Sequence, residues 1–289
     1  MRKLFLTLCL FSFTQYGFAN ALYQSNGDTV SERPVRIMII PLNPTYYLSD
    51  ADQQLSEYNH VSSKQIRDWF RSGLEANVNA GIITNDEYQT QRFIDADNED
   101  LQNDLHQIYY GYGLAYEKAL LPNIVEGEVE HKSVSDIITD LFKQDDSNRS
   151  ASDKHNLGEV YPSDQDDQYL NIKLHNPRML SDLAEKYQVD MFVFINQFEV
   201  KTNYETCLDR ATNNFERQFT VHFSIFNKKG KQIYGNSATL YTDSNSRDMT
   251  EIISHYLPKL CGYISDQVPA RIKVKPDQQA EQDSSIWQE

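Results

Sequence analysis

The side chains in this sequence that could do chemistry are few and scattered. The sequence contains no Gly-x-Ser-x-Gly, no His-Glu-x-x-His and no phosphate-binding loop of the Walker type. Gly111 and Gly113 lack the third glycine and the preceding strand of a dinucleotide-binding fingerprint. The sequence therefore predicts no catalytic residue and no cofactor.

Two acidic segments resemble cation sites without completing one. Residues 95–99 begin like an EF-hand calcium loop, but Asp100 replaces the glycine of the sixth position and His106 the glutamate of the twelfth. Residues 164–167 hold three aspartates that could attract a cation. Solvated acidic segments explain both runs with fewer assumptions, so we predict no metal site.

Three cysteines occur, and Cys9 lies inside an N-terminal apolar run. If the chain is exported, Cys207 and Cys261 are expected to form a disulfide. It would close a loop of about 54 residues and stabilise the fold by about 4 kcal/mol at most. Two free buried thiols are the alternative, as is a nucleophilic cysteine beside His255 or His222.

An aromatic group is the one candidate for an interaction site. It consists of Tyr109, Tyr110, Tyr112 and Tyr116. Aromatic clusters bind glycans or proteins, but residues at helical spacing also pack inside a fold. We keep the four tyrosines as interaction candidates.

The N-terminus reads as a targeting segment. Arg2 and Lys3 precede an apolar run at residues 4–13, which is too short to cross a bilayer. We predict a signal peptide over residues 1–19, with cleavage after Ala21 as the alternative, and a flexible leader over residues 20–33. The mature chain would then be periplasmic or secreted, with no integral membrane span.

The chain is acidic overall. It has 42 acidic and 27 basic side chains and a net charge of −15. Such a surface repels nucleic acid, so no nucleic-acid partner is expected. It remains compatible with basic partners and divalent cations.

Hydrophobic periodicity predicts an α+β fold, with helices packed on a mixed β-sheet. Residues 189–200 have two largely apolar faces, with Phe192, Phe194, Phe198 and Val200 expected on one of them, and form the central strand. The predicted order is β-α-β-(helical insertion)-α-β-β-β-α. Its segments are strand 35–42, helix 64–79 ended by Gly81, strand 82–84, helix 181–188, strands 189–200, 215–226 and 232–241, and helix 247–268 kinked or split by Pro258.

A single domain is predicted over residues 34–268, followed by a disordered tail at 269–289. Residues 93–176 form an insertion with helices at 99–118 and 133–143 and an acidic loop at 144–168. Residues 202–214 are expected to be a long connection that carries Cys207. His222 is expected on the outer face of its strand. We expect a working surface on the insertion or near Cys207.

Three stretches together resemble a known family. They are VRIMIIPL at 35–42, LAEKYQVDMFVFINQFEV at 183–200 and a hairpin with the turn KKGKQIY at 228–234. They are similar to the fold shared by the TolB amino-terminal domain, CsgG and LpoB-type bacterial envelope proteins, over residues 34–92 and 177–268. The insertion, the absence of a lipid-anchoring cysteine and of a following propeller, and the lack of long amphipathic hairpins depart from that pattern.

The resemblance implies a non-enzymatic envelope protein that binds another protein. Such a protein would be an accessory to an envelope assembly, secretion or cell-wall synthesis complex. One alternative is an enzyme acting on a cell-wall or extracellular polymer, which would need a carboxylate pair such as Glu199 or Glu216 with Asp190. Another is a secreted acidic protein that binds a cation or a basic partner.

Overall fold

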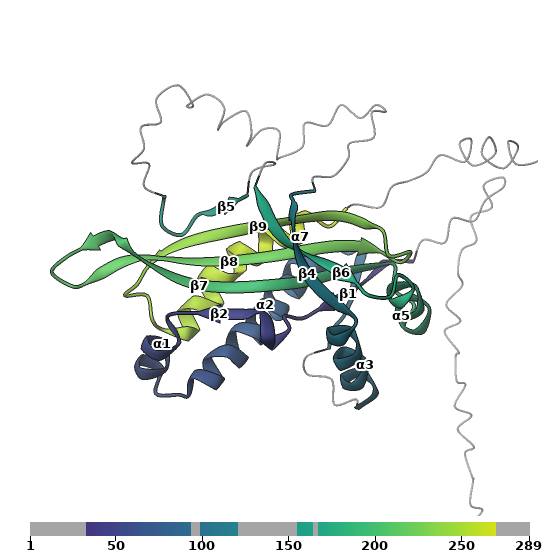
Figure 1. The fold of residues 1–289 in the computed structure, drawn as a ribbon, viewed down its shortest axis with the longest axis horizontal. Helices are drawn as coiled ribbons and strands as arrows, with labels where there is room; N and C mark the ends of the chain where they lie inside the picture. The colour runs from purple at the N-terminus through teal and green to yellow at the C-terminus, as the bar shows by residue number, and fades with distance from the viewer. Residues whose placement is uncertain (1–32, 94–98, 121–154, 164–166, 270–289) are drawn as a thin grey trace, which may run out of the picture. The chain divides into compact units, whose positions relative to one another are not determined.

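The computed structural model describes residues 33–93, 99–120, 155–163 and 167–269. Its centre is a mixed sheet of seven strands (Figure 1). Six strands lie in the order β3, β1, β7, β8, β9, β5, and β2 pairs with β7. Their bounds are β1 Val35–Ile40, β2 Tyr47–Ser49, β3 Tyr88–Gln91, β5 Val160–Pro162, β7 Met191–Asp209, β8 Asn214–Asn227 and β9 Gln232–Asp243. The predicted α+β class with a mixed sheet is confirmed.

Strand β7 is the central strand, as its two apolar faces predicted. It runs parallel to β1 and antiparallel to β8. A β-bulge at Asn196 interrupts its alternation. Phe192 and Phe194 pack on one face of the sheet, whereas Phe198 and Val200 join the core on the other face. The prediction that all four share one face is therefore wrong, because the extra residue of the bulge turns the strand over.

Helices cover one face of this sheet. They are α1 (Asp52–Asn59), α2 (Ser63–Ile83), α6 (Met249–Glu251), the π-helical segment η3 (Ile252–Tyr256) and α7 (Leu257–Asp266). The Ser62 side chain accepts a hydrogen bond from the Gln65 amide and caps α2. The C-terminal helix runs without a break from Met249 to Asp266 and becomes π-helical over η3, ahead of Pro258, which cannot donate a backbone hydrogen bond and crowds the preceding turn.

Gly81 lies inside α2 rather than ending it. A Cβ atom at Gly81 would lie 2.3 Å from Ser265 Oγ, so the glycine lets α2 approach α7 closely. The helix therefore continues to Ile83. The strand predicted at residues 82–84 is wrong, and the edge strand β3 begins at Tyr88.

The described parts of the insertion cover the opposite face. They comprise α3 (Glu99–Tyr110), β4 (Tyr112–Lys118) and β6 (Gln168–Leu174), which are followed by α5 (Met179–Tyr187). Strands β4 and β6 form a separate antiparallel pair. Helix α3 is shorter than predicted, because Gly111 turns the chain where a Cβ atom would lie 2.3 Å from Met179 Sδ. Residues 1–32, 121–154 and 270–289, with the predicted signal peptide, second helix and tail, lie outside the described residues.

Buried hydrogen bonds attach β6 to the main sheet. The Asn196 amide donates to Leu170 O at 2.8 Å and to Ser224 Oγ at 2.7 Å. Ser224 Oγ in turn donates to Asn171 Oδ1 at 2.7 Å. Buried polar groups are costly unless paired, so this network requires β6 to remain at one position on the sheet. Asn196, the residue at the β-bulge of β7, thus also holds β6 of the insertion on the main sheet.

His222 lies beneath β6 and not on an outer face, so its predicted position is wrong. The residue is 9% exposed, and its Nδ1 atom accepts a hydrogen bond from the Leu170 amide at 3.1 Å. Burial lowers the pKa of His222 to about 4. The folded state therefore favours the neutral imidazole. This contribution to stability is complete above the unfolded pKa near 6.5 and is lost as the pH falls toward 4.

We expect His222→Gln to reduce the acid sensitivity of the fold. Glutamine can accept the Leu170 hydrogen bond but does not titrate. Between about pH 7.5 and about pH 5, the wild type should lose about 2 kcal/mol more free energy of unfolding than the variant. Urea denaturation at both pH values measures this difference. His106→Gln, on the exposed surface of α3, should follow the wild type, and parallel curves for His222→Gln and the wild type would contradict the prediction.

Candidate functional site

The hairpin of β7 and β8 extends beyond the other strands (Figure 1). Strand β2 pairs with β7 as far as Val200, and β9 pairs with β8 as far as Glu216. Residues 204–215 form a two-stranded extension, which we call the hairpin arm. It is held by the pairs of Cys207 with Phe215 and of Asp209 with Asn214. The predicted long connection at residues 202–214 is wrong, because a register shift after residue 203 hides the alternation of a strand.

The tip of the hairpin arm has a defined conformation. The Asp209 carboxylate accepts hydrogen bonds from Thr212 Oγ1 at 2.8 Å and from the Ala211 amide at 2.9 Å. These bonds hold the pKa of Asp209 below its usual value. Asn213 adopts the left-handed conformation that closes the turn, with φ of 49°. The arm therefore presents its side chains from an ordered turn.

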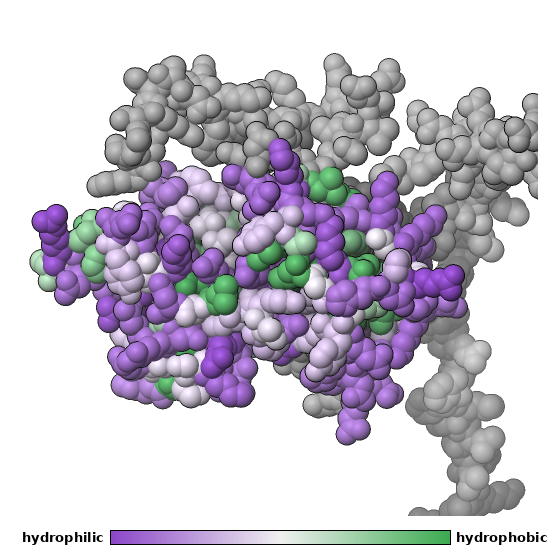
Figure 2. Space-filling view, viewed as in Figure 1, coloured by the Kyte–Doolittle hydropathy of each residue, from purple (hydrophilic) through white to green (hydrophobic). Residues whose placement is uncertain are grey.

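The hairpin arm exposes an aromatic side chain. Tyr204 is 58% exposed, and its ring packs edge-on against Phe215 with 5.3 Å between centroids. Figure 2 shows a few moderately hydrophobic residues among hydrophilic ones at this end, and more strongly hydrophobic residues toward the middle of the same face. A lone two-stranded hairpin is at best marginally stable in water. Such an arm gains stability when a second surface covers it.

A buried arginine anchors the root of the arm. Arg217 is fully buried, and its Nη2 atom donates to Gln54 Oε1 on α1 at 2.7 Å. Its Nε atom lies 3.4 Å from Thr202 Oγ1, and the Thr202 amide donates to the Asp50 carboxylate at 2.9 Å. Burial lowers the pKa of the Arg217 guanidinium, which still remains charged at neutral pH. The arm is thus attached to the helical layer and cannot swing freely at its base.

The predicted disulfide is not formed in the structure, where Cys207 and Cys261 are both free. Cys207 is exposed on the hairpin arm. Cys261 is fully buried in α7, and its thiol faces the carbonyl of Leu74 on α2 at 3.6 Å. Burial raises the pKa of the Cys261 thiol well above its usual value. The two cysteines therefore occupy different environments, an exposed strand and the hydrophobic core.

Of the four candidate tyrosines, Tyr112 is buried, Tyr109 is partly buried and the other two are exposed. Tyr109 Oη donates to Pro41 O at 3.1 Å, and burial raises its pKa to about 12. Tyr112 is 3% exposed and packs against the core. Tyr110 and Tyr116 are 83% and 66% exposed. The helix end at Tyr110 separates them, so they do not form the single aromatic cluster that was predicted.

The candidate carboxylates are not brought together. Asp190 pairs with Arg33 at 2.8 Å, and Glu216 lies buried 3.4 Å from His155 Nδ1. Glu199 is nine positions beyond Asp190 on the extended β7, which corresponds to roughly 30 Å. Hydrolysis by a carboxylate pair needs the two groups within about 10 Å. These residues therefore do not form the predicted pair.

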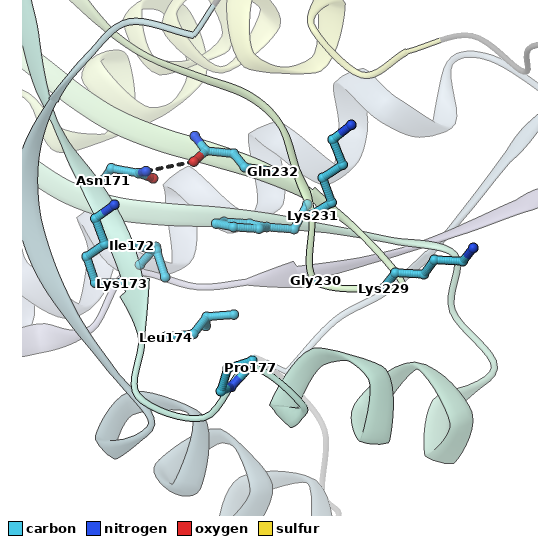
Figure 3. Close-up of a pocket in the computed structure, with 10 residues that line it drawn as sticks. Asn171, Ile172, Lys173, Leu174, Pro177, Lys229, Gly230, Lys231 and Gln232 are labelled. Atoms are coloured by element: carbon cyan, nitrogen blue, oxygen red, sulfur yellow. Dashed lines mark hydrogen bonds between the residues drawn. The ribbon is translucent and has the colours of Figure 1, made fainter.

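A groove lies between β6 and the turn that joins β8 to β9. Its volume is about 380 Å³ (Figure 3). The hydrogen bond from Asn171 to Gln232 Oε1, 2.7 Å long, crosses it at one end. The residues that line it are Asn171, Ile172, Lys173, Leu174, Pro177, Phe226, Lys229, Gly230, Lys231 and Gln232. We call this space the lysine-rimmed groove.

The turn beside the groove is rigid. Asn227 Oδ1 accepts hydrogen bonds from the amides of Lys229 and Lys231, both at 3.0 Å. Gly230 has a φ of 77°, in the left-handed region that favours glycine. A Cβ atom on Gly230 would lie 3.3 Å from Pro177 O across the groove. The lysine backbones are therefore fixed while their side chains point outward.

The groove is cationic in an acidic protein. Lys173 pairs with Glu117, and Lys228 pairs with Asp190 at 3.7 Å. Lys229 and Lys231 are exposed and form no ion pair with the described residues. The sequence identified this segment only as a turn. Three lysines within four positions of an acidic chain were the signal that could have marked it.

The described residues hold no group of three or more histidine, cysteine, aspartate or glutamate side chains that could bind a metal. The calcium-like segment at residues 95–99 and the aspartates at 164–167 lie mostly outside the described part. Within the described ranges, no helix is long and apolar enough to cross a membrane.

The fold and these surfaces define an α+β protein with an exposed hairpin arm and a lysine-rimmed groove. No protein-family model matches the chain, and no curated protein matches it. The resemblance to the TolB, CsgG and LpoB-type fold therefore stays a prediction.

Proposed function

We propose that this protein is a non-catalytic, exported envelope protein that binds another protein through its hairpin arm. The observation that carries the proposal is the extension of β7 and β8 beyond their neighbours, with Tyr204 exposed on it. The family resemblance supports a role as an accessory to an envelope assembly, secretion or cell-wall synthesis complex.

The physical basis for binding is preorganisation. Arg217 secures the root of the arm, and Asp209 orders its tip, so little conformational freedom remains to be lost on association. Tyrosine offers a large contact area with few rotatable bonds, and it is enriched at interfaces. Apart from Phe215, whose backbone bonds to Ser244, the outer edges of the arm pair with no other described strand and add backbone donors and acceptors.

Site-specific photo-crosslinking in the producing cells tests the proposal. A benzophenone amino acid at position 204 should give a discrete adduct with one envelope protein. The same group at position 110, which is more exposed but lies on α3, should give none. Adducts of the same pattern from both positions, or none from position 204, would rule out the arm as the contact.

A second measurement separates contact from folding. With the photoreactive group moved to position 208, Tyr204→Ala should weaken the adduct, while Tyr58→Ala, of similar exposure on α1, should leave it unchanged. Circular dichroism should be the same for both variants, because each side chain is mostly solvent-exposed. An adduct insensitive to Tyr204→Ala would contradict the proposal.

The exported location is proposed from residues 1–19 alone. Mass spectrometry of the protein isolated from cells tests it. A mature chain that begins at Asn20 or Leu22 supports export with cleavage, and a chain that retains Met1 in the cytosol contradicts it.

A further inference from the structure

One edge of β6 is only partly hydrogen-bonded within the described chain. The His175 amide donates to Gly111 O at 2.9 Å, and the Ala119 amide donates to Asp167 O at 3.3 Å. These contacts flank the β4–β6 ladder and fix which of its pairs are hydrogen-bonded. By alternation, the N–H and C=O groups of Leu170, Ile172 and Leu174 point away from β4.

The hydrogen bonds of Leu170 confirm that its backbone groups point away from β4. The Leu170 amide donates to His222, and its carbonyl accepts from Asn196, so both groups are satisfied by the main sheet. Within the described chain, the corresponding groups of Ile172 and Leu174 form no hydrogen bond. Both residues line the lysine-rimmed groove. The groove thus contains an unpaired strand edge, which is a template for another strand.

The remaining walls define what such a strand must carry. Leu174 is partly exposed and supplies apolar surface, beside the buried side chains of Ile172 and Phe226. Lys229 and Lys231 supply two ammonium groups that no described carboxylate neutralises. Side chains of an extended peptide alternate between two faces. A peptide on this edge would place every second residue on the apolar surface and the others toward the lysines.

We propose that the lysine-rimmed groove binds an extended segment of a partner protein in which acidic and apolar residues alternate, by strand addition to β6. The backbone edge favours a peptide over a phosphate or a lipid headgroup, neither of which can pair with Ile172 and Leu174 as a strand does. The volume of about 380 Å³ suits a few residues of such a segment.

This inference rests on the proposed function in taking the partner to be a protein, but it concerns a different surface. The hairpin arm lies at one end of β8, whereas the groove lies beside Phe226 and the turn at the other end. Loss of peptide binding with retained crosslinks at position 204 overturns this inference alone. Peptide binding without those crosslinks overturns only the arm as a contact.

Fluorescence anisotropy with the full-length chain tests the inference. The probe is fluorescein-labelled Glu-Val-Asp-Val-Glu-Val amide, and its matched control is Gln-Val-Asn-Val-Gln-Val amide. Saturable binding of the acidic probe is expected, with the uncharged control at least about tenfold weaker. Absence of saturable binding, equal binding of the two peptides, or displacement of the probe by inorganic phosphate at equal concentration overturns the inference.

Two further variants distinguish strand addition from charge attraction. Lys229→Gln combined with Lys231→Gln should weaken binding of the acidic probe about tenfold. Lys64→Gln combined with Lys201→Gln makes the same charge change at other exposed sites and should leave this binding unchanged. Probes N-methylated at odd or at even positions should differ, because only one set of amides faces β6. Equal binding of the two methylated probes, or equal weakening by the two double variants, overturns the inference.

Discussion

Phe70→Ala is expected to lower the free energy of unfolding by about 4 kcal/mol. Phe70 is fully buried on α2, where it contacts three rings of the sheet side. Its centroid lies 5.2 Å from Phe198, 6.0 Å from Phe219 and 6.0 Å from Tyr47. Truncation removes apolar area and leaves a cavity that three rigid rings cannot fill. The side chain joins α2 to β2, β7 and β8 at one point.

Urea denaturation followed by circular dichroism measures this loss. Phe70→Leu, which fills more of the space, should cost less than Phe70→Ala. Tyr110→Ala, at an exposed position on α3, should remain within about 0.5 kcal/mol of the wild type. A loss below about 1 kcal/mol for Phe70→Ala would show that α2 is not held by this aromatic cluster.

Gly235→Ala is expected to destabilise the protein by about 3 kcal/mol. A Cβ atom at Gly235 on β9 would lie 1.9 Å from Tyr169 Oη and 2.3 Å from Gln232 Nε2. Tyr169 belongs to β6 and is fully buried, so its ring has no open space to enter. The methyl group would therefore force β6 away from the main sheet and disrupt the hydrogen bonds around Asn196.

Gly113→Ala in β4 is the matched control. Its Cβ atom would meet only His175 Nε2, at 3.5 Å, which is an ordinary contact. Neither glycine has a positive φ. Alanine at position 113 should be neutral or stabilise the strand by up to about 1 kcal/mol. Equal stabilities of the two variants in urea denaturation would show that β6 does not press on β9 as described.

The order of the main elements could be predicted because it depends on local patterns. In residues 189–200, the side chains on both faces of the predicted strand are largely apolar, and such a strand is stable only where both faces are covered. The disturbed helical turn before Pro258 follows from the chemistry of proline.

Other features depend on distant neighbours and could not be predicted. Gly81 and Gly111 are the same residue in similar contexts, but Gly81 continues a helix against Ser265 and Gly111 ends one against Met179. The bulge at Asn196 is an extra residue that no alternation rule identifies. Each outcome is decided by a side chain that the local sequence does not contain.

The candidate site also combines features that were visible in the local sequence with features that depend on the fold. The lysines at 228, 229 and 231 are evident in the sequence, but the groove exists because β6 crosses the sheet beside them. The hairpin arm was expected near Cys207 only as a connection, because its register shift conceals the strands. Composition identifies the charge of a surface, and only the fold supplies its hollows and edges.

The pairing of β1 with β7 also dictates an order of events as the chain folds. Arg36 and Asp190 are 154 positions apart and adjacent in space, whereas β7, β8 and β9 follow one another through short turns. Closing the longer loop costs more chain entropy, so we expect the three-strand meander to form before β1 pairs with it. Residues 35–40 can pair with β3 earlier, but their pairing with β7 requires the chain to have reached residue 194.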